Sequence, residues 1–268
     1  MTKQVAIITG GSSGIGKALV HTYADNGYAV VFTGRNEERM LEVEAELAKK
    51  NATFLGLRLD AAGIADNQSL IDQTVAKFGR IDVLICNAGI GMRALFEEMD
   101  IEVFQKVMDI NFNGMLYATK FALPHILKSK GSIIGISSIN GHRGTPARTA
   151  YTASKFAMEG FFESLRTEVM KRGVHILVVS PGFTSSNIRN QALAADGKSQ
   201  GESPRDEGKM MSAEEVATQT YKAMVKRKRD LVLTTQGKLA VFLNKWMPGR
   251  MDKIVYNVMA KEPDSPFK

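Results

Sequence analysis

Seven short runs of consecutive apolar residues recur along the chain, separated by longer segments whose apolar residues follow a helical spacing. The runs are rich in Val and Ile and are apolar throughout rather than at every second position. This pattern is typical of strands that are buried on both faces of a parallel sheet. The predicted strands lie near residues 4–9, 28–33, 53–59, 81–86, 131–137 and 174–180, with a weaker one near 230–234.

Helical segments fill most of the intervals between these runs. They are predicted over about 14–26, 36–50, 66–79, 100–128, 150–172 and 212–228. Strands that alternate with helices favour right-handed βαβ units and a doubly wound α/β sheet. We therefore expect one domain over residues 1–268, with a mostly parallel seven-stranded sheet and helices on both of its faces.

One long segment, 187–211, lacks both patterns. It is polar and rich in Gly, Ser and charged residues. A connection of this length is usually a functional lid or a disordered loop. It follows Ser180-Pro181-Gly182 at the end of a predicted strand, the edge at which open α/β sheets bind ligands. We expect a substrate lid here.

The C-terminal segment 236–261 contains two amphipathic helical stretches, separated by Pro248-Gly249. Their apolar residues are Leu239, Phe242, Leu243, Trp246 and Met247 in the first stretch, and Met251, Ile254, Val255, Val258 and Met259 in the second. Such a stripe can pack against its own domain or close over a site, or it can contact another copy of the chain. Because Lys and Arg accompany it, it can also lie on a membrane surface.

The net charge of +7 arises in the C-terminal part of the chain. Residues 222–268 contain eleven Lys and Arg against four Asp and Glu, and the rest of the chain is balanced. The cluster Lys226-Arg227-Lys228-Arg229 has no interleaved aromatic residues and no recognition motif, so we expect no nucleic-acid partner.

The single cysteine, Cys86, excludes an intrachain disulfide and is compatible with a reducing compartment. One cysteine and four scattered histidines form no metal-ligand pattern, so no metal site is expected. No signal-peptide-like stretch and no apolar run of membrane-spanning length is present. We expect a cytoplasmic protein, with peripheral membrane contact through the basic C-terminal segment left open.

A glycine-rich turn, Thr9-Gly10-Gly11-Ser12-Ser13-Gly14-Ile15-Gly16, joins the first predicted strand to the first predicted helix. Glycine lets the backbone approach a pyrophosphate, and the amide groups at a helix N-terminus face the anion. In this context the turn predicts dinucleotide binding. The expected contacts are Gly10, Ser12, Ser13, Gly14, Ile15 and Gly16.

Tyr151 and Lys155 lie four residues apart in a predicted helix and so share one of its faces. An ammonium group beside a phenol favours the phenolate, which makes the tyrosine a better proton donor and acceptor near neutral pH. Ser138 lies thirteen residues upstream, at the end of a predicted strand. The three side chains together indicate acid–base chemistry on a carbonyl or hydroxyl group.

These motifs, in this order, resemble the short-chain dehydrogenase/reductase family from about residue 3 to residue 186. The C-terminal segment looks like that of lipid- and steroid-type carbonyl reductases related to the hydroxysteroid dehydrogenases. The resemblance implies a Rossmann fold and a homodimer or homotetramer. It implies a catalytic tetrad of Asn111, Ser138, Tyr151 and Lys155. It further implies cofactor contacts from Asp60, Ala61, Asn87, Ala88, Gly89, Tyr151, Lys155, Pro181, Gly182 and Ser186, with Ser186 in place of the family's threonine.

In the roles that the resemblance implies, Tyr151 exchanges a proton with the substrate oxygen and Ser138 hydrogen-bonds that oxygen. Lys155 favours the phenolate and binds the nicotinamide ribose, and Asn111 holds a water molecule of a proton relay. The cofactor supplies the hydride.

The residues after the second predicted strand bear on the choice of nicotinamide. NAD sites usually have a carboxylate there, whereas this chain has Arg35 and Asn36, and no acid before Glu37. A guanidinium group suits a 2′-phosphate, so we expect NADP(H). Ser13 stands where some NADP enzymes of the family have a basic residue, so NAD(H) is the alternative.

The predicted function is NADP(H)-dependent hydride transfer between the nicotinamide and a ketone or secondary alcohol, with an apolar small-molecule substrate. A long-chain 3-keto lipid reductase at a membrane surface is one alternative. A different class is a sensor or scaffold that binds NAD(P) without turnover. Because such a protein has no need of all four tetrad residues, their joint presence favours the enzyme.

Overall fold

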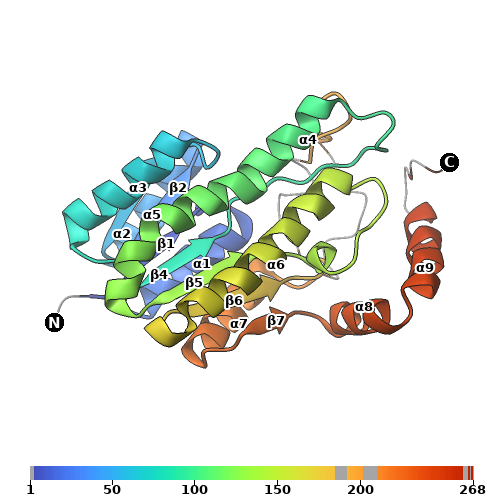
Figure 1. The fold of residues 1–268 in the computed structure, drawn as a ribbon. Helices are drawn as coiled ribbons and strands as arrows, with labels where there is room; N and C mark the ends of the chain where they lie inside the picture. Colours follow the sequence, from blue (N-terminus) through green and yellow to red (C-terminus); the bar gives the residue numbers. More distant parts are fainter. Residues whose placement is uncertain (1–2, 185–191, 202–209, 262–264, 266, 268) are drawn as a thin grey trace.

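The computed structural model describes residues 3–184, 192–201, 210–261, 265 and 267. Within these residues seven strands form one sheet in the order β3-β2-β1-β4-β5-β6-β7, and every neighbouring pair is parallel (Figure 1). The strands are β1 (Val5–Ile8), β2 (Ala29–Gly34), β3 (Phe54–Arg58), β4 (Val83–Cys86), β5 (Ser132–Ile136), β6 (His175–Ser180) and β7 (Asp230–Val232). The predicted seven-stranded α/β fold is confirmed, and its sheet is wholly parallel.

Helices cover both faces of the sheet. On one face α1 (Gly14–Asp25), α2 (Glu37–Lys49) and α7 (Ala213–Val225) pack with Val20, Leu47 and Val216 in the core. On the other face α3 (Ile64–Phe78), α5 (Gly114–Ser129) and α6 (Thr149–Val169) pack with Leu70 and Phe162. The two buried layers account for the continuously apolar strands, since each strand has no face left in water.

The strand order reverses between β1 and β4, which are adjacent in the sheet although two strands separate them in sequence. At such a switch point the loops leave the carboxyl ends in opposite directions and open a crevice. The glycine-rich turn follows β1, and Asn87 follows β4, so both lie at this crevice. Ser138 follows the next strand, β5.

The helix predicted over 100–128 contains an interruption. It begins as α4 (Ile101–Met108), widens into a π-helical turn over Asp109–Asn113 and continues as α5. The turn contains Asn111, whose completely buried side chain is hydrogen-bonded to the backbone of Ile90. Turns of this kind are frequent at functional sites.

The C-terminal segment forms the two predicted helices, α8 (Thr235–Trp246) and α9 (Pro248–Ala260), next to the 3-10 turn Ile139–Gly141. Figure 1 shows α9 standing beyond the carboxyl edge of the sheet rather than on either face. Proline at the start of α9 ends α8, as the sequence predicted. No helix of the described residues is long and apolar enough to cross a bilayer.

The segment predicted as a lid, 187–211, is described only over 192–201 and 210–211. In that part Leu193 is buried against Met92, Val103 and Ala150. Its backbone exchanges hydrogen bonds with Gly91 and Arg93. This stretch is therefore anchored to the body of the domain beside the site. The remainder of the predicted lid and Ser186 lie outside the described residues.

Candidate active site

The glycine-rich turn has the shape that close backbone approach requires. Gly10 and Gly14 have φ values of +66° and +52°, which favour glycine. A side chain on Gly16 would place its Cβ 2.0 Å from the Gly10 carbonyl oxygen. Only glycine fits at position 16, which allows the start of α1 to pack directly against the backbone of Gly10.

Residues from the end of β4 hold this turn in place. The Asn87 amide donates to the carbonyl oxygens of Thr9 (2.9 Å) and Gly10 (3.1 Å). In return the Thr9 hydroxyl accepts from the backbone N–H groups of Asn87 and Ala88. Asn87 and Ala88, which were predicted as cofactor contacts, therefore support the turn from the end of β4.

The N-terminus of α1 is open to an anion. Ser13 occupies the N-cap position with extended backbone, and its side chain makes no capping hydrogen bond. The first amide groups of the helix therefore keep their donors for a ligand. Together with the space that Gly16 leaves, this arrangement fits the pyrophosphate of a dinucleotide.

The loops after β2 and β3 lie farther along the same edge. Arg35 is exposed, and Asn36 caps α2 by accepting from the Arg39 N–H at 2.8 Å. Glu37 pairs with Arg58 at 3.1 Å.

The loop after β3 contains the predicted adenine contacts. The Asp60 carboxylate accepts from the Ala62 N–H at 3.1 Å, and the Ala61 carbonyl accepts from the Asn67 amide. Asp60 is exposed, so this short loop is ordered by its own hydrogen bonds while its acid stays accessible.

Tyr151 and Lys155 lie in the first turns of α6, as predicted. The Lys155 ammonium group is 5.6 Å from the centroid of the Tyr151 ring and donates to the Ile136 carbonyl oxygen at 2.9 Å. Lys155 is 3% exposed, and this burial lowers its pKa to about 8 against the opposing influence of Glu159. The lysine therefore titrates near neutral pH.

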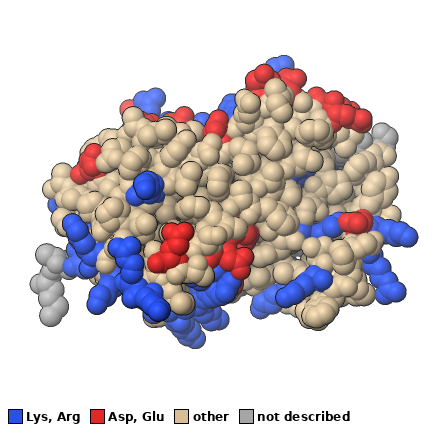
Figure 2. All heavy atoms as spheres, viewed as in Figure 1, with Lys and Arg blue, Asp and Glu red and all other residues tan. Residues whose placement is uncertain are grey.

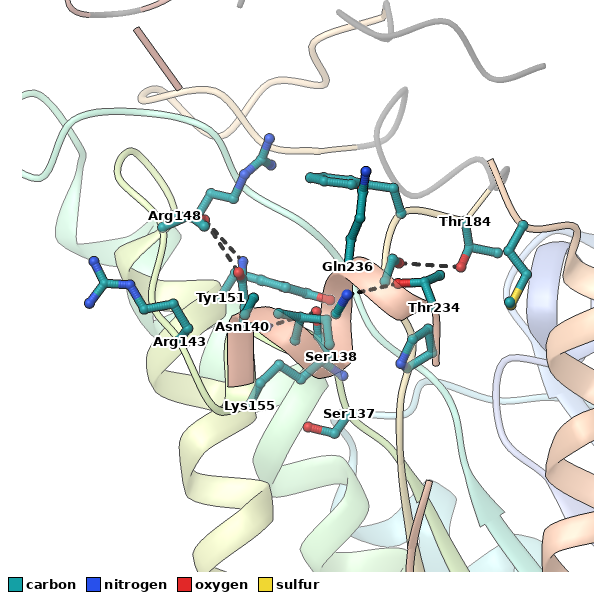
Figure 3. Close-up of a pocket in the computed structure, with 18 of the residues that line it drawn as sticks. Ser137, Ser138, Asn140, Arg143, Arg148, Tyr151, Lys155, Thr184, Thr234 and Gln236 are labelled. Carbon is teal, nitrogen blue, oxygen red and sulfur yellow. Dashed lines mark hydrogen bonds between the residues drawn. The ribbon is translucent and has the colours of Figure 1, made fainter. Parts of the chain in front are cut away.

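Ser138 follows the end of β5, whereas Tyr151 lies on α6. Its hydroxyl oxygen accepts from the Asn140 N–H at 3.2 Å, so the following 3-10 turn orients it. In Figure 3 Ser138 and Tyr151 face the same space, with Lys155 behind them. The neighbouring Ser137 is buried and points away from that space (Figure 3).

Asn111 is joined to α6 through its side chain. Its amide donates to the Ser154 hydroxyl at 3.0 Å and to the Ile90 carbonyl at 3.0 Å. These bonds tie the π-helical turn to the residue that precedes Lys155. All four predicted catalytic residues therefore come from elements that meet at one place.

A cavity of about 1110 Å³ is lined by Ser138, Tyr151 and Lys155, whereas Asn111 lies outside its lining. Ile15, Asn87 and Gly89 line its cofactor end, and Ser138, Tyr151 and Lys155 its centre. Pro181 and Gly182, after β6, also line it, as predicted. The far wall comes from α8 and α9 and consists of Leu239, Ala240, Leu243, Met251, Ile254, Val255, Val258 and Met259.

Polar contacts hold this far wall to the loop after Ser138. The Asn244 amide donates to the His142 carbonyl at 3.0 Å, and Arg143 pairs with Asp252 at 2.8 Å. We call this set of contacts the clasp. Sequence reasoning missed the clasp, as well as Thr184 and Thr234 in the cavity lining, because none of them belongs to a motif.

The apolar residues of the two C-terminal helices lie in different environments. Leu239 and Leu243 of the first stripe line the cavity, whereas Phe242 and Trp246 are 61% and 68% exposed. Met251 and Met259 of the second stripe are buried. Figure 2 shows Lys and Arg side chains gathered around these helices, at the right of the view.

A family model described as short chain dehydrogenase matches residues 4–197. Dehydrogenase/reductase SDR family member 7B of Mus musculus is 34% identical over 268 residues, covering 97% of this chain and 83% of the mouse chain. 11-beta-hydroxysteroid dehydrogenase A of Sesamum indicum is 40% identical over 188 residues, covering 69% of this chain and 53% of the other.

Among solved structures, a short chain dehydrogenase/reductase from Burkholderia phymatum in complex with NAD has a TM-score of 0.81. The match covers 91% of this chain and 93% of that one, at 24% identity, and so bears on the fold. The family model spans more than half of this chain, and the mouse relative matches nearly all of it. The chain belongs to the short-chain dehydrogenase/reductase family of oxidoreductases, with that family's NAD(P)-binding Rossmann fold.

Proposed function

We propose that this protein is an NADP(H)-dependent oxidoreductase that interconverts an apolar ketone and its secondary alcohol. The observation that supports this most directly is the single cavity that connects the glycine-rich turn to Tyr151, Lys155 and Ser138 and ends in an apolar wall. A cavity of this size and lining suits a ligand with a large apolar body and one polar group.

In the reducing direction Ser138 donates a hydrogen bond to the carbonyl oxygen and holds it beside Tyr151. The nicotinamide, when bound, supplies the hydride that forms the new C–H bond. Tyr151 gives its phenolic proton to the substrate oxygen, which yields the alcohol and leaves a phenolate. The ammonium group of Lys155 stabilises that phenolate. In the oxidising direction each of these proton steps is reversed.

The remaining residues position this machinery. The turn from Gly10 to Gly16 and the open N-terminus of α1 would hold the pyrophosphate, and Asp60 the adenine. Asn111 ties the π-helical turn to α6 through Ser154 and would help to hold a water molecule near Lys155. Tyr151 and Lys155 would also contact the nicotinamide ribose.

The cofactor preference rests on Arg35. It is exposed just after β2, where a ribose 2′-phosphate would lie, and the next acid along the chain, Glu37 at the start of α2, is paired with Arg58. A guanidinium group binds a phosphate through two hydrogen bonds. Because the similar Burkholderia phymatum structure contains NAD, fold alone does not select the nicotinamide.

The test is a fluorescence titration with NADPH and NADH, followed by the loss of reduced-nicotinamide absorbance with a panel of ketones and aldehydes. We expect tighter binding of NADPH and turnover of apolar ketones. If the wild-type protein binds NADPH tightly but turns over no ketone of any chain length, even in the presence of vesicles, the result would favour the sensor or scaffold instead.

Contact with a membrane surface is a second proposal, supported by the outer face of α8 and α9. Phe242, Trp246 and Tyr256 are exposed there beside Lys245 and Lys253. Aromatic and cationic side chains on one helical face suit a bilayer interface that delivers a lipophilic ketone. Flotation with anionic vesicles at low salt tests this, and no flotation of wild type would refute it. The alternative occupant, another copy of the chain, would appear as a dimer by sedimentation.

A further inference from the structure

A third ionisable side chain lies on the same face of α6 as the proposed acid–base pair. Tyr151, Lys155 and Glu159 follow one another at intervals of four residues. This spacing stacks side chains along one side of a helix. Glu159 therefore continues the line from the cavity into the protein, one turn behind Lys155. Its side chain is only 20% exposed.

A short chain of hydrogen bonds holds the Glu159 carboxylate. The Ser180 hydroxyl, at the end of β6, donates to Glu159 Oε1 at 3.3 Å. His142 Nε2 lies 3.0 Å from the Ser180 hydroxyl and 3.5 Å from Glu159 Oε1. With Ser180 donating to Glu159, the Nε2–H of His142 donates to Ser180. Ser180 thus donates to the carboxylate directly, and His142 supports it through Ser180, which favours the ionised form of Glu159.

The space around this carboxylate is tightly filled. A side chain on Gly141 would place its Cβ 3.1 Å from Glu159 Oε1 and 2.6 Å from the Ser137 hydroxyl. Glu159 therefore packs closely against the 3-10 turn that follows Ser138. Its position is fixed by α6, β6 and this turn together.

Several ionisable groups surround the Glu159 carboxylate. Lys155 lies on the same helix, His142 on the loop after the 3-10 turn, Asp230 on β7, and Arg166 two turns farther along α6. Burial raises the pKa of Glu159, while the nearby Ser137 hydroxyl, His142 and the Ser180 hydroxyl oppose that rise. Glu159 in turn is the foremost group that raises the pKa of Lys155 against burial. Because the two side chains lie one turn apart on the same face of α6, the Glu159 carboxylate and the Lys155 ammonium group attract each other.

Resting on the function proposed above, we propose that Glu159 is a positioning residue whose carboxylate keeps Lys155 in its ammonium form and thereby sets the pH at which the Tyr151–Lys155 pair loses a proton. Ser180 and His142 hold the carboxylate for this purpose. The catalytic pair is extended by an acid that touches neither substrate nor cofactor.

The sign of the effect follows from charge. Removing a negative charge near the Tyr151–Lys155 pair makes it easier for the pair to lose a proton. The apparent pKa of the pair therefore falls. Glu159→Gln keeps the size of the side chain and removes the charge. We expect the limb of the kcat/KM profile that reports the pair to move to lower pH by on the order of one unit. In alcohol oxidation the activity then rises at lower pH, and in ketone reduction it is lost at lower pH.

The experiment measures kcat/KM against pH in both directions for full-length wild type, Glu159→Gln, Glu159→Asp and Glu163→Gln. Glu163 is the matched control, since it lies one turn farther along α6 but is exposed and pairs with Arg229. We expect Glu159→Asp to retain most of the wild-type profile and Glu163→Gln to superimpose on wild type. If Glu159→Gln does not fold, Ser180→Ala provides the second variant, with a smaller shift in the same direction.

Superimposed profiles for wild type and Glu159→Gln, with both folded and both dependent on Tyr151, would overturn this inference and leave the proposed function standing. An upward shift would overturn it as well. Turnover that survives Tyr151→Phe in the wild-type background would instead refute the proposed function itself, so the two failures are distinguishable.

Discussion

The ammonium group of Lys155 donates a hydrogen bond to the carbonyl oxygen of Ile136, 2.9 Å away. Ile136 is the last residue of β5 and lies two positions before Ser138. One contact therefore joins the helix of Tyr151 to the strand that presents Ser138, and a shift of either element would change the space between them. It also gives a buried cation a single strong acceptor in a place that water reaches poorly.

This burial predicts that Lys155 costs stability in the protein without cofactor. Since its pKa falls from 10.5 to about 8, the folded state disfavours the charged form. Lys155→Met should raise the free energy of unfolding by roughly 2 kcal/mol below about pH 8 while removing turnover. The gain should shrink as the pH rises from 8 to 10.5, because the unfolded lysine then loses its proton too. Urea unfolding at several pH values measures this; a gain that grows with pH would contradict it.

Tyr151→Phe tests the proposed proton transfer with the smallest change of shape. We expect kcat to fall by on the order of 10²–10⁴, since general acid–base catalysis contributes about this much. NADPH affinity should stay within a few-fold of wild type. Tyr117→Phe, on α5 and away from the cavity lining, serves as the control. Unchanged kcat in Tyr151→Phe would exclude the mechanism.

Arg35→Asp tests the choice of nicotinamide. Loss of a charge-assisted contact with the 2′-phosphate should weaken NADPH binding by roughly 10- to 100-fold, and the new carboxylate should improve NADH binding. Lys49→Asp, at the other end of α2, makes the same kind of charge change far from the turn. Titration by fluorescence compares the three proteins. Equal NADPH-to-NADH ratios in wild type and Arg35→Asp would rule out the assignment of NADP(H) to Arg35.

Alanine substitutions at two glycines, Gly16 and Gly160, should have opposite effects, because a side chain would clash at the first and has open space at the second. Gly16→Ala would force a Cβ to within 2.0 Å of the Gly10 carbonyl, so we expect loss of cofactor binding and a lower melting temperature. Gly160→Ala, in the middle of α6, meets nothing within 4 Å and should stabilise the protein by about 0.5–1 kcal/mol. Calorimetry with and without NADPH distinguishes the two. Intact NADPH binding by Gly16→Ala would argue against the proposed pyrophosphate site.

The clasp predicts a specific loss of affinity for large substrates. Asp252→Lys removes the ion pair between Asp252 and Arg143 and places two positive charges side by side. This repulsion should loosen α9 from the cavity. We expect KM to rise several-fold for long apolar ketones and to change little for small ones, with kcat preserved. Lys253→Asp alters charge at the next position, which is exposed and outside the clasp. A uniform rise in KM for all substrates in Asp252→Lys would count against a role of α9 in holding the apolar body.

Local pattern accounted for most of the fold. The continuous apolar runs predicted all seven strands, and Pro248 correctly separated two C-terminal helices. The sequence also predicted the helix that contains Asn111, but not its π-helical turn. In that turn the side chain of Asn111 is hydrogen-bonded to the backbone of Ile90 in a distant loop, a contact that helical periodicity does not encode.

The sequence by itself determined the order of elements, the glycine-rich turn and the Tyr151–Lys155 spacing, because each depends on residues within a few positions of one another. Only the tertiary structure decided that Glu159 lies behind Lys155 with Ser180 and His142, and that α8 and α9 form the far wall of the cavity. These relationships join residues far apart in the chain, and the packing of α6, β6 and the C-terminal helices brings them together. Local propensity does not predict such packing, because the packing minimises the free energy of many long-range contacts together.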